Sequence, residues 1–134
     1  MKKKYIAGSA VACALLSSPL LSTVYADTTS ASVAPSVVYV STTGSDTSGT
    51  GTQVSPFATI NTALSKVATN GTVIVEPGTD KGMVTITKPV TLESDPTASN
   101  ATANTVIDGT GQNHAVLITS SDVTVQGLTM ENAQ

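Results

Sequence analysis

The chain has few aromatic residues, a single Cys and no Arg. It contains no Trp, one Phe and three Tyr among 134 residues, and only 11% of its residues are charged. The lone Cys13 can form neither an intramolecular disulfide nor a set of thiolate metal ligands. Without Arg, and with a formal net charge of −3, the chain is a poor partner for nucleic acid or an anionic membrane surface.

The first 26 residues have the pattern of a signal peptide. Three lysines at positions 2–4 precede an apolar segment at 10–16, and residues 24–26 (Val-Tyr-Ala) place small residues at −3 and −1 of a cleavage site. Ser and Pro interrupt the apolar stretch, so it falls short of the roughly 20 apolar residues of a membrane span. We therefore expect a secreted protein, extracellular or at the cell surface, with a flexible Ser/Thr-rich leader at 27–36.

One amphipathic helix is expected over residues 56–69. Ser55 is the predicted N-cap, Pro56 occupies the first helical position and Asn70-Gly71 provides the stop. Four apolar residues share one face at helical spacing, namely Phe57, Ile60, Leu64 and Val67. This face must pack against another part of the chain.

The remaining chain alternates short β-branched runs with turn residues. Strands are predicted over 37–40, 72–75, 83–87, 90–92, 105–107, 115–118, 123–125 and 128–130, with corners at positions such as Pro77-Gly78. The segment from Val84 to Leu92 repeats from Val116 to Val125, at offsets of 32 and 33 residues. A repeat of this length indicates a solenoid. The predicted fold is all-β, a parallel β-helix over residues 37–134 with about two coils in 72–134.

Several segments together resemble the N-terminal part of right-handed parallel β-helix proteins of the pectate-lyase-like superfamily. They are Tyr39-Val40-Ser41 with Gly44-Ser45-Asp46, the helix start at 55–60, Gly71–Val75 with Pro77-Gly78-Thr79, the turn at 105–109, and residues 123–130. The resemblance implies an N-terminal helix that caps the first coil. One departure is Asp80, where these proteins commonly have an aromatic residue, and we expect it to weaken the packing of that corner.

The same resemblance implies a module of proteins that act on or bind extracellular polysaccharide. Their catalytic groups lie on central coils, so we expect no catalytic site and no turnover on this chain. The apolar run at 128–130 has no polar cap after it, which suggests a truncated N-terminal piece. Its open end would then meet missing downstream coils or a second copy. A non-catalytic cell-surface or adhesion β-helix, or a truncated remnant, are the alternatives.

Few residues are candidates for chemistry. Asp46 and Asp108 could supply oxygen ligands to Ca²⁺, although turn hydrogen bonds explain both without a metal. Polysaccharide β-elimination needs a base, and the lysines beyond the signal are Lys66, Lys81 and Lys88, each expected to be structural. Four other residues are expected to have no catalytic or sugar-binding role: Glu93, Asp95, the sole His114, and Phe57 on the buried face of the helix. Tyr39 is then the one aromatic side chain left for a sugar platform, which is weak support for one.

Overall fold

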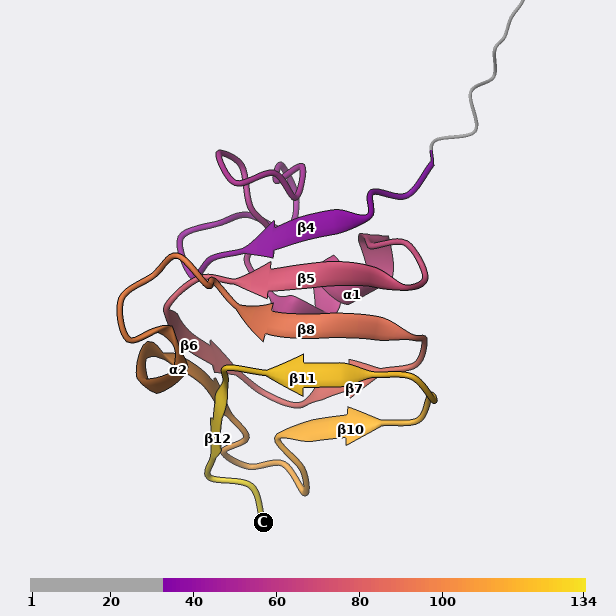
Figure 1. Ribbon diagram of the computed structural model, residues 1–134. Coiled ribbons are helices and arrows are strands. Elements are labelled where there is room, and N and C mark those ends of the chain that lie inside the picture. The colour runs from indigo at the N-terminus through magenta and orange to yellow at the C-terminus, as the bar shows by residue number, and fades with distance from the viewer. Residues whose placement is uncertain (1–32) are drawn as a thin grey trace, which may run out of the picture. The chain divides into compact units, whose positions relative to one another are not determined.

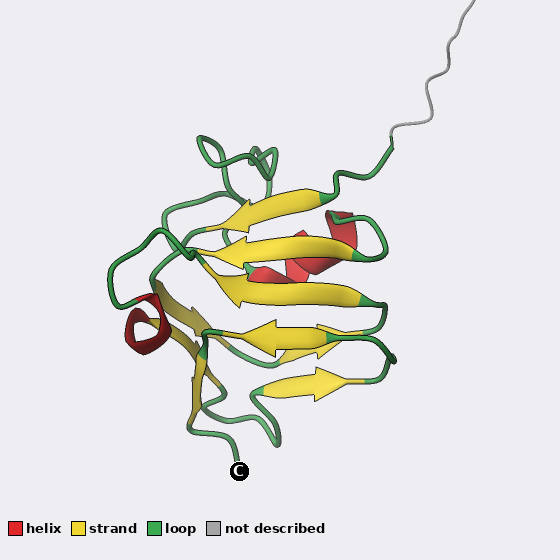
Figure 2. Ribbon diagram, in the orientation of Figure 1, coloured by secondary structure: helices red, strands yellow, loops and turns green. Residues whose placement is uncertain are grey.

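Parallel strands make up most of the regular secondary structure in this computed structural model, which describes residues 33–134 (Figures 1 and 2). The predicted signal peptide and residues 27–32 of the predicted leader lie outside the described residues. The strands are β4 (Val37–Val40), β5 (Gly71–Val75), β6 (Gly78–Lys81), β7 (Val84–Ile86), β8 (Val90–Ser94), β9 (Thr105–Asp108), β10 (Val116–Ile118), β11 (Thr124–Gln126) and β12 (Thr129–Glu131). The helices are α1 (Ile60–Lys66) and α2 (Ala101–Asn104).

The strands form three parallel sheets, with orders β11-β8-β5-β4, β12-β9-β6 and β10-β7. Strands β5, β6 and β7 lie one in each sheet, and β8, β9 and β10 pair with them in the same order. Strands β11 and β12 then add to the first two sheets. This arrangement of parallel sheets is compatible with the predicted all-β class and with a solenoid.

The strand register confirms the sequence repeat. Val84 pairs with Val116 and Thr91 with Thr124, at the predicted offsets of 32 and 33 residues. The turn of the chain from β5 to β8 is shorter than the turn from β8 to β11, since Gly71 pairs with Val90. The longer turn has most of its additional residues in two connections. One contains α2 and joins β8 to β9, and the other joins β9 to β10. Loops therefore absorb the length while the sheets keep their register.

Alternate strand residues point inward and form one apolar core. Its least exposed members include Val38, Val73, Ile86, Leu92 and Ile107, each at most 1% exposed. The apolar face of the predicted helix joins this core through Phe57, Ile60, Leu64 and Val67. Figure 1 shows α1 behind the four-stranded sheet, where it packs against β4, β5 and β7. The helix thus covers the core at the N-terminal end of the sheets.

The predicted helix start at Pro56 is wrong, because α1 begins only at Ile60 with Thr59 as its N-cap. Residues before it continue along β4 instead: the Phe57 N–H donates to the Tyr39 carbonyl at 3.0 Å, and the Ser41 N–H to the Phe57 carbonyl at 2.9 Å. A segment that hydrogen-bonds to a strand cannot also wind into a helix. The predicted end at residue 69 is also late, since Val67 is the C-cap.

Pro77-Gly78 is followed by a strand that the sequence pattern did not predict. Strand β6, Gly-Thr-Asp-Lys, has no apolar residue and pairs with β9 through Gly78–Thr105 and Lys81–Asp108. Asp80 takes an inward-facing position beside Ile107. Its carboxylate accepts the Ile60 N–H at 2.9 Å. Asp80 thus anchors the start of α1, and the expectation that it weakens the packing of this corner stays a prediction.

Candidate functional site

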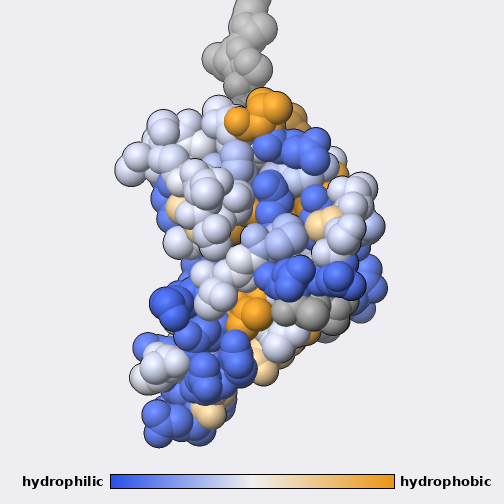
Figure 3. All heavy atoms as spheres, turned by 90° about the vertical axis from the view of Figure 1, so that its left-hand side faces the viewer, coloured by the Kyte–Doolittle hydropathy of each residue, from blue (hydrophilic) through white to orange (hydrophobic). Residues whose placement is uncertain are grey.

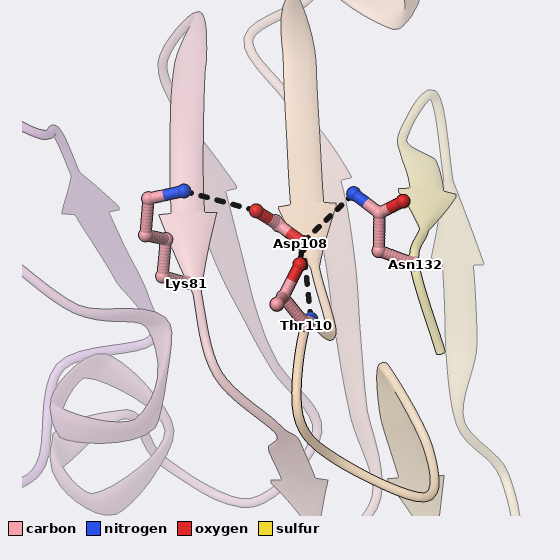
Figure 4. A network of polar contacts seen from close by, with 4 residues as sticks. All are labelled: Lys81, Asp108, Thr110 and Asn132. Carbon is pink, nitrogen blue, oxygen red and sulfur yellow. Dashed lines mark hydrogen bonds and ion pairs between the residues drawn. The ribbon is translucent and has the colours of Figure 1, made fainter. Parts of the chain in front are cut away.

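The most connected polar group of the described residues is the Asp108 carboxylate, which joins three strands of one sheet (Figure 4). Its Oδ2 accepts a hydrogen bond from Nζ of Lys81, on β6, at 2.9 Å. Its Oδ1 accepts Asn132 Nδ2, just beyond β12, at 3.0 Å. Thr110 donates to the same oxygen through its backbone N–H at 3.0 Å and its hydroxyl at 2.5 Å. We call these four residues the Asp108 network.

Local sequence and the sheet register together explain this geometry. The Asp-Gly-Thr-Gly turn follows β9 directly, and the bond from Thr110 N–H to a carboxylate two residues earlier is the Asx turn that the sequence predicted. Lys81 arrives from β6 because it is the register partner of Asp108. An added Cβ at Gly109 would lie 2.9 Å from the Ala115 Cα, so the turn can pass Ala115 only with glycine at that position.

Hydrogen bonding makes Asp108 a firmly ionised group. The Thr110 hydroxyl, then Lys81 and Asn132, hold the pKa of Asp108 far below its ordinary range. The Asp108 side chain is 10% exposed, whereas that of Lys81 is 77% exposed. The ion pair is therefore screened on its lysine side and contributes mainly geometry, fixing β6, β9 and the end of β12 relative to one another.

Two further carboxylates, those of Asp46 and Asp80, lie at the start of α1. Asp46 Oδ1 accepts the N–H groups of Ala58 at 2.8 Å and Thr59 at 3.0 Å, and Oδ2 accepts the Thr59 hydroxyl at 2.8 Å. These donors lie 12 or 13 residues away, not in a local turn as expected. Desolvation raises the pKa of Asp46, but the bonds from Thr59 and Ala58 outweigh it and lower the pKa. Asp80 differs: burial raises its pKa, the Ile60 N–H opposes this, and the Asp46 charge adds to the rise.

Neither Ca²⁺ candidate has a free set of oxygen ligands. Both Asp46 and Asp108 already accept hydrogen bonds on each carboxylate oxygen, and a cation at Asp108 would have to displace the Lys81 ammonium. Within residues 33–134 there is no cluster of three or more His, Cys, Asp or Glu side chains suited to a metal. Calcium binding thus stays a prediction without a built site in the described chain.

The other candidates are spread over separate elements. Lys66 lies in the last turn of α1, and the Lys88 ammonium donates to the Val67 carbonyl at the end of that helix. Both positions suit a cation beside helix carbonyls. Asp95 accepts the N–H and hydroxyl of Thr97, and exposed His114 lies in the connection before β10. The structure gathers none of these groups into a constellation for proton transfer.

A polar face that the sequence analysis did not assemble lies on the outside of the four-stranded sheet. Outward residues stack across it in two rows set by the register: Val37, Thr72, Thr91 and Thr124 in one, and Tyr39, Ile74, Glu93 and Gln126 in the other. Gln126 Nε2 donates to Glu93 Oε1 at 2.9 Å, so a side-chain hydrogen bond links the adjacent strands β11 and β8. Tyr39 is partly exposed on this face, whereas Phe57 is 5% exposed and unavailable. Strand alternation and the repeat offsets could have paired Thr91 with Thr124 and Glu93 with Gln126. They could not have added the members on β4 and β5, which pair at other offsets.

The side of the molecule that carries β6, β12 and α2 is largely hydrophilic in Figure 3, with hydrophobic colour confined to isolated spots. No helix within residues 33–134 is long and apolar enough to cross a membrane. No protein-family model, curated protein or solved structure matches the chain. Functional inference therefore rests on the residues and their geometry.

Proposed function

We propose that this chain is an exported, right-handed parallel β-helix module that binds extracellular polysaccharide without turning it over. The pectate-lyase-like resemblance supports the handedness, and so does the general rule that crossovers between parallel strands of one sheet are right-handed. The three parallel sheets support the β-helix architecture. The binding role rests on one observation, the two rows of outward side chains on the β4-β5-β8-β11 sheet.

These rows have the chemistry that a sugar chain requires. Tyr39 supplies an aromatic surface, and Glu93 and Gln126 supply an acceptor and an amide in the same row. The second row adds three threonine hydroxyls. Four neighbouring strands span about 14 Å at roughly 4.8 Å each, so the face can meet an extended chain along its length.

Charge favours a neutral polysaccharide over a polyanionic one. Glu93 is the charged side chain in these two rows, and no lysine lies in either. A polyuronate would meet repulsion from Glu93 and from a chain whose formal net charge is negative. The rows also contain no Lys or Arg, the usual base in β-elimination, which supports binding without turnover.

Affinity electrophoresis through gels containing neutral or acidic polysaccharides tests the binding. We expect retardation by a neutral polysaccharide, and roughly tenfold weaker binding for Tyr39→Ala and Gln126→Ala, which corresponds to about 1.4 kcal/mol. Thr79→Ala, at an exposed position on β6, is the matched control and should bind like the parent. Absence of retardation by every polysaccharide, or equal loss for Thr79→Ala, would contradict the proposal.

Export and lack of turnover have direct tests. N-terminal sequencing of the protein recovered from the medium should begin at Asp27 if residues 1–26 are a cleaved signal. Incubation with the bound polysaccharide should produce neither new reducing ends nor the ultraviolet absorbance of an unsaturated sugar. Appearance of either product would place this chain among enzymes and not among binding modules.

A further inference from the structure

One of the two outward rows on the four-stranded sheet changes in character along its length. Tyr39 on β4 and Ile74 on β5 present apolar surface, whereas Glu93 on β8 and Gln126 on β11 are polar. Gln126 is exposed, and the other three side chains are half-buried. Adjacent strands lie about 4.8 Å apart, so the apolar half directly adjoins the polar half. A sugar ring can use both halves, because its C–H face is apolar and its edge carries hydroxyl groups.

Glu93 lies where the two halves meet, with a neighbour on each side. Ile74 is its register partner on β5, and Gln126 is its register partner on β11. The hydrogen bond from Gln126 Nε2 to Glu93 Oε1 restrains the orientation of the carboxylate. Within residues 33–134 the Glu93 carboxylate makes no other hydrogen bond and no ion pair. Its Oε2 is therefore an acceptor without a partner in this part of the chain, although both neighbouring side chains are in place.

The acceptor sites that remain on Glu93 define the groups that can bind there. A carboxylate has about four lone-pair sites on its two oxygens, and Gln126 occupies one of them. Because a carboxylate only accepts hydrogen bonds, the group that completes it must be a donor. Hydroxyl groups of a neutral sugar meet this requirement, and two hydroxyls on adjacent ring carbons can each donate to one carboxylate oxygen. The second Nε2 hydrogen of Gln126 can donate to a further sugar oxygen.

We propose that Glu93, oriented by Gln126, determines which sugars this face binds by accepting two hydroxyls on adjacent ring carbons. This inference rests on the polysaccharide-binding role proposed above and names the specificity of that role. The C–H face of the sugar ring lies on Ile74, one strand away from Glu93, and the next sugar lies toward Tyr39. The ligand is thus a neutral polysaccharide in which each sugar has two adjacent free hydroxyls.

The position of the glycosidic linkage separates sugars that meet this requirement from sugars that do not. A 1,4-linked hexopyranose chain keeps the adjacent hydroxyls on C2 and C3 free. A 1,3-linked chain keeps those on C2 and C4, which are not adjacent and cannot both reach one carboxylate. Hydrogen bonds to a charged acceptor are stronger than those between neutral groups. We therefore expect a 1,4-linked chain to bind at least about tenfold more tightly than a 1,3-linked chain.

Titration calorimetry of the protein expressed from its full sequence tests this inference with hexasaccharides of 1,4-linked β-glucose, 1,4-linked β-mannose and 1,3-linked β-glucose. The tighter of the two 1,4-linked compounds should bind at least about tenfold more tightly than the 1,3-linked compound. Glu93→Gln keeps the size of the side chain but removes its charge and one acceptor oxygen, so this preference should fall below about threefold. Glu131→Gln is the matched control, since Glu131 is exposed on β12 in another sheet, and it should keep the preference.

The parent protein alone can refute the inference, so the test does not depend on a variant that folds. Equal binding of the 1,4-linked and 1,3-linked compounds by the parent, or a preference that survives Glu93→Gln, would overturn the role of Glu93. Retardation of the parent by a neutral polysaccharide, together with weaker binding of Tyr39→Ala, would then still support the proposed binding role. If no polysaccharide retards the parent and no hexasaccharide binds, the binding role and this inference are both wrong.

Discussion

Replacing Asn61 by Ala should release the outer edge of β7 from α1. The Asn61 amide is the described group that satisfies both the Met83 carbonyl and the Thr85 N–H, at 2.8 and 3.1 Å. Ala retains the helix and removes both bonds. The substitution therefore isolates the side chain's role as a substitute strand.

The expected loss follows from the competing contributions. Two hydrogen bonds contribute about 1–3 kcal/mol together, with the lower end appropriate where water can replace them. Ala recovers up to about 0.7 kcal/mol because its helix propensity exceeds that of Asn. The free energy of unfolding should fall by about 1 kcal/mol, and Tm by about 4–8 °C for a domain of this size.

Urea unfolding and amide exchange measure these effects. The Thr85 amide should exchange at least tenfold faster in Asn61→Ala. Ser65→Ala is the control, since Ser65 is exposed on the same helix and bonds only within it, to the Thr62 carbonyl at 2.7 Å. It should change stability by less than about 0.5 kcal/mol and leave Thr85 exchange unaltered. Equal behaviour of the two variants would refute the role of Asn61.

Four further substitutions probe a corner and its control, the core and the Asp108 network. Gly127→Ala should lower the free energy of unfolding, measured in urea, by about 2 kcal/mol, because φ is +67° and the new Cβ would lie 2.3 Å from Ser94 Oγ. Gly111→Ala is its control: φ is +80° but no atom lies within 4 Å, so this variant should lose only the free energy of the backbone strain. Thr105→Val should stabilise by about 1 kcal/mol in the same assay, because the buried Thr105 hydroxyl has no described partner, and a loss would mean that it has one. Asp108→Asn should lower stability at pH 7. Because the folded-state pKa of Asp108 is depressed, the gap to the parent should narrow as pH falls below about 4, and a constant gap would exclude the charge as its cause.

Strand positions could be predicted from sequence because inward residues alternate and repeat at fixed offsets. Val84 and Val116 illustrate this, since both the strands and their register follow from the repeat. Strand β6 could not be predicted in this way, because Gly78–Lys81 carries no apolar residue and its position follows from β9 beside it. The helix start was misplaced for the same kind of reason: Phe57 pairs with β4, a tertiary contact that overrides local helix signals.

The polar sites separate in the same way into local and distant contacts. Asp108 was correctly placed in an Asx turn, since its Thr110 partner is two residues away. Its bonds to Lys81 and Asn132 required the sheet register. Asp46 and Asp80 reach the start of α1 from other segments, and no spacing rule connects residues 13 or 20 positions apart.

Those distant contacts explain why α1, only seven residues long, is stable where it lies. A helix this short is marginal by itself. Here Asp46 and Asp80 anchor its start, and Asn61, within the helix, bonds to the backbone of Met83 and Thr85. Each anchor also covers polar backbone at the N-terminal end of the core.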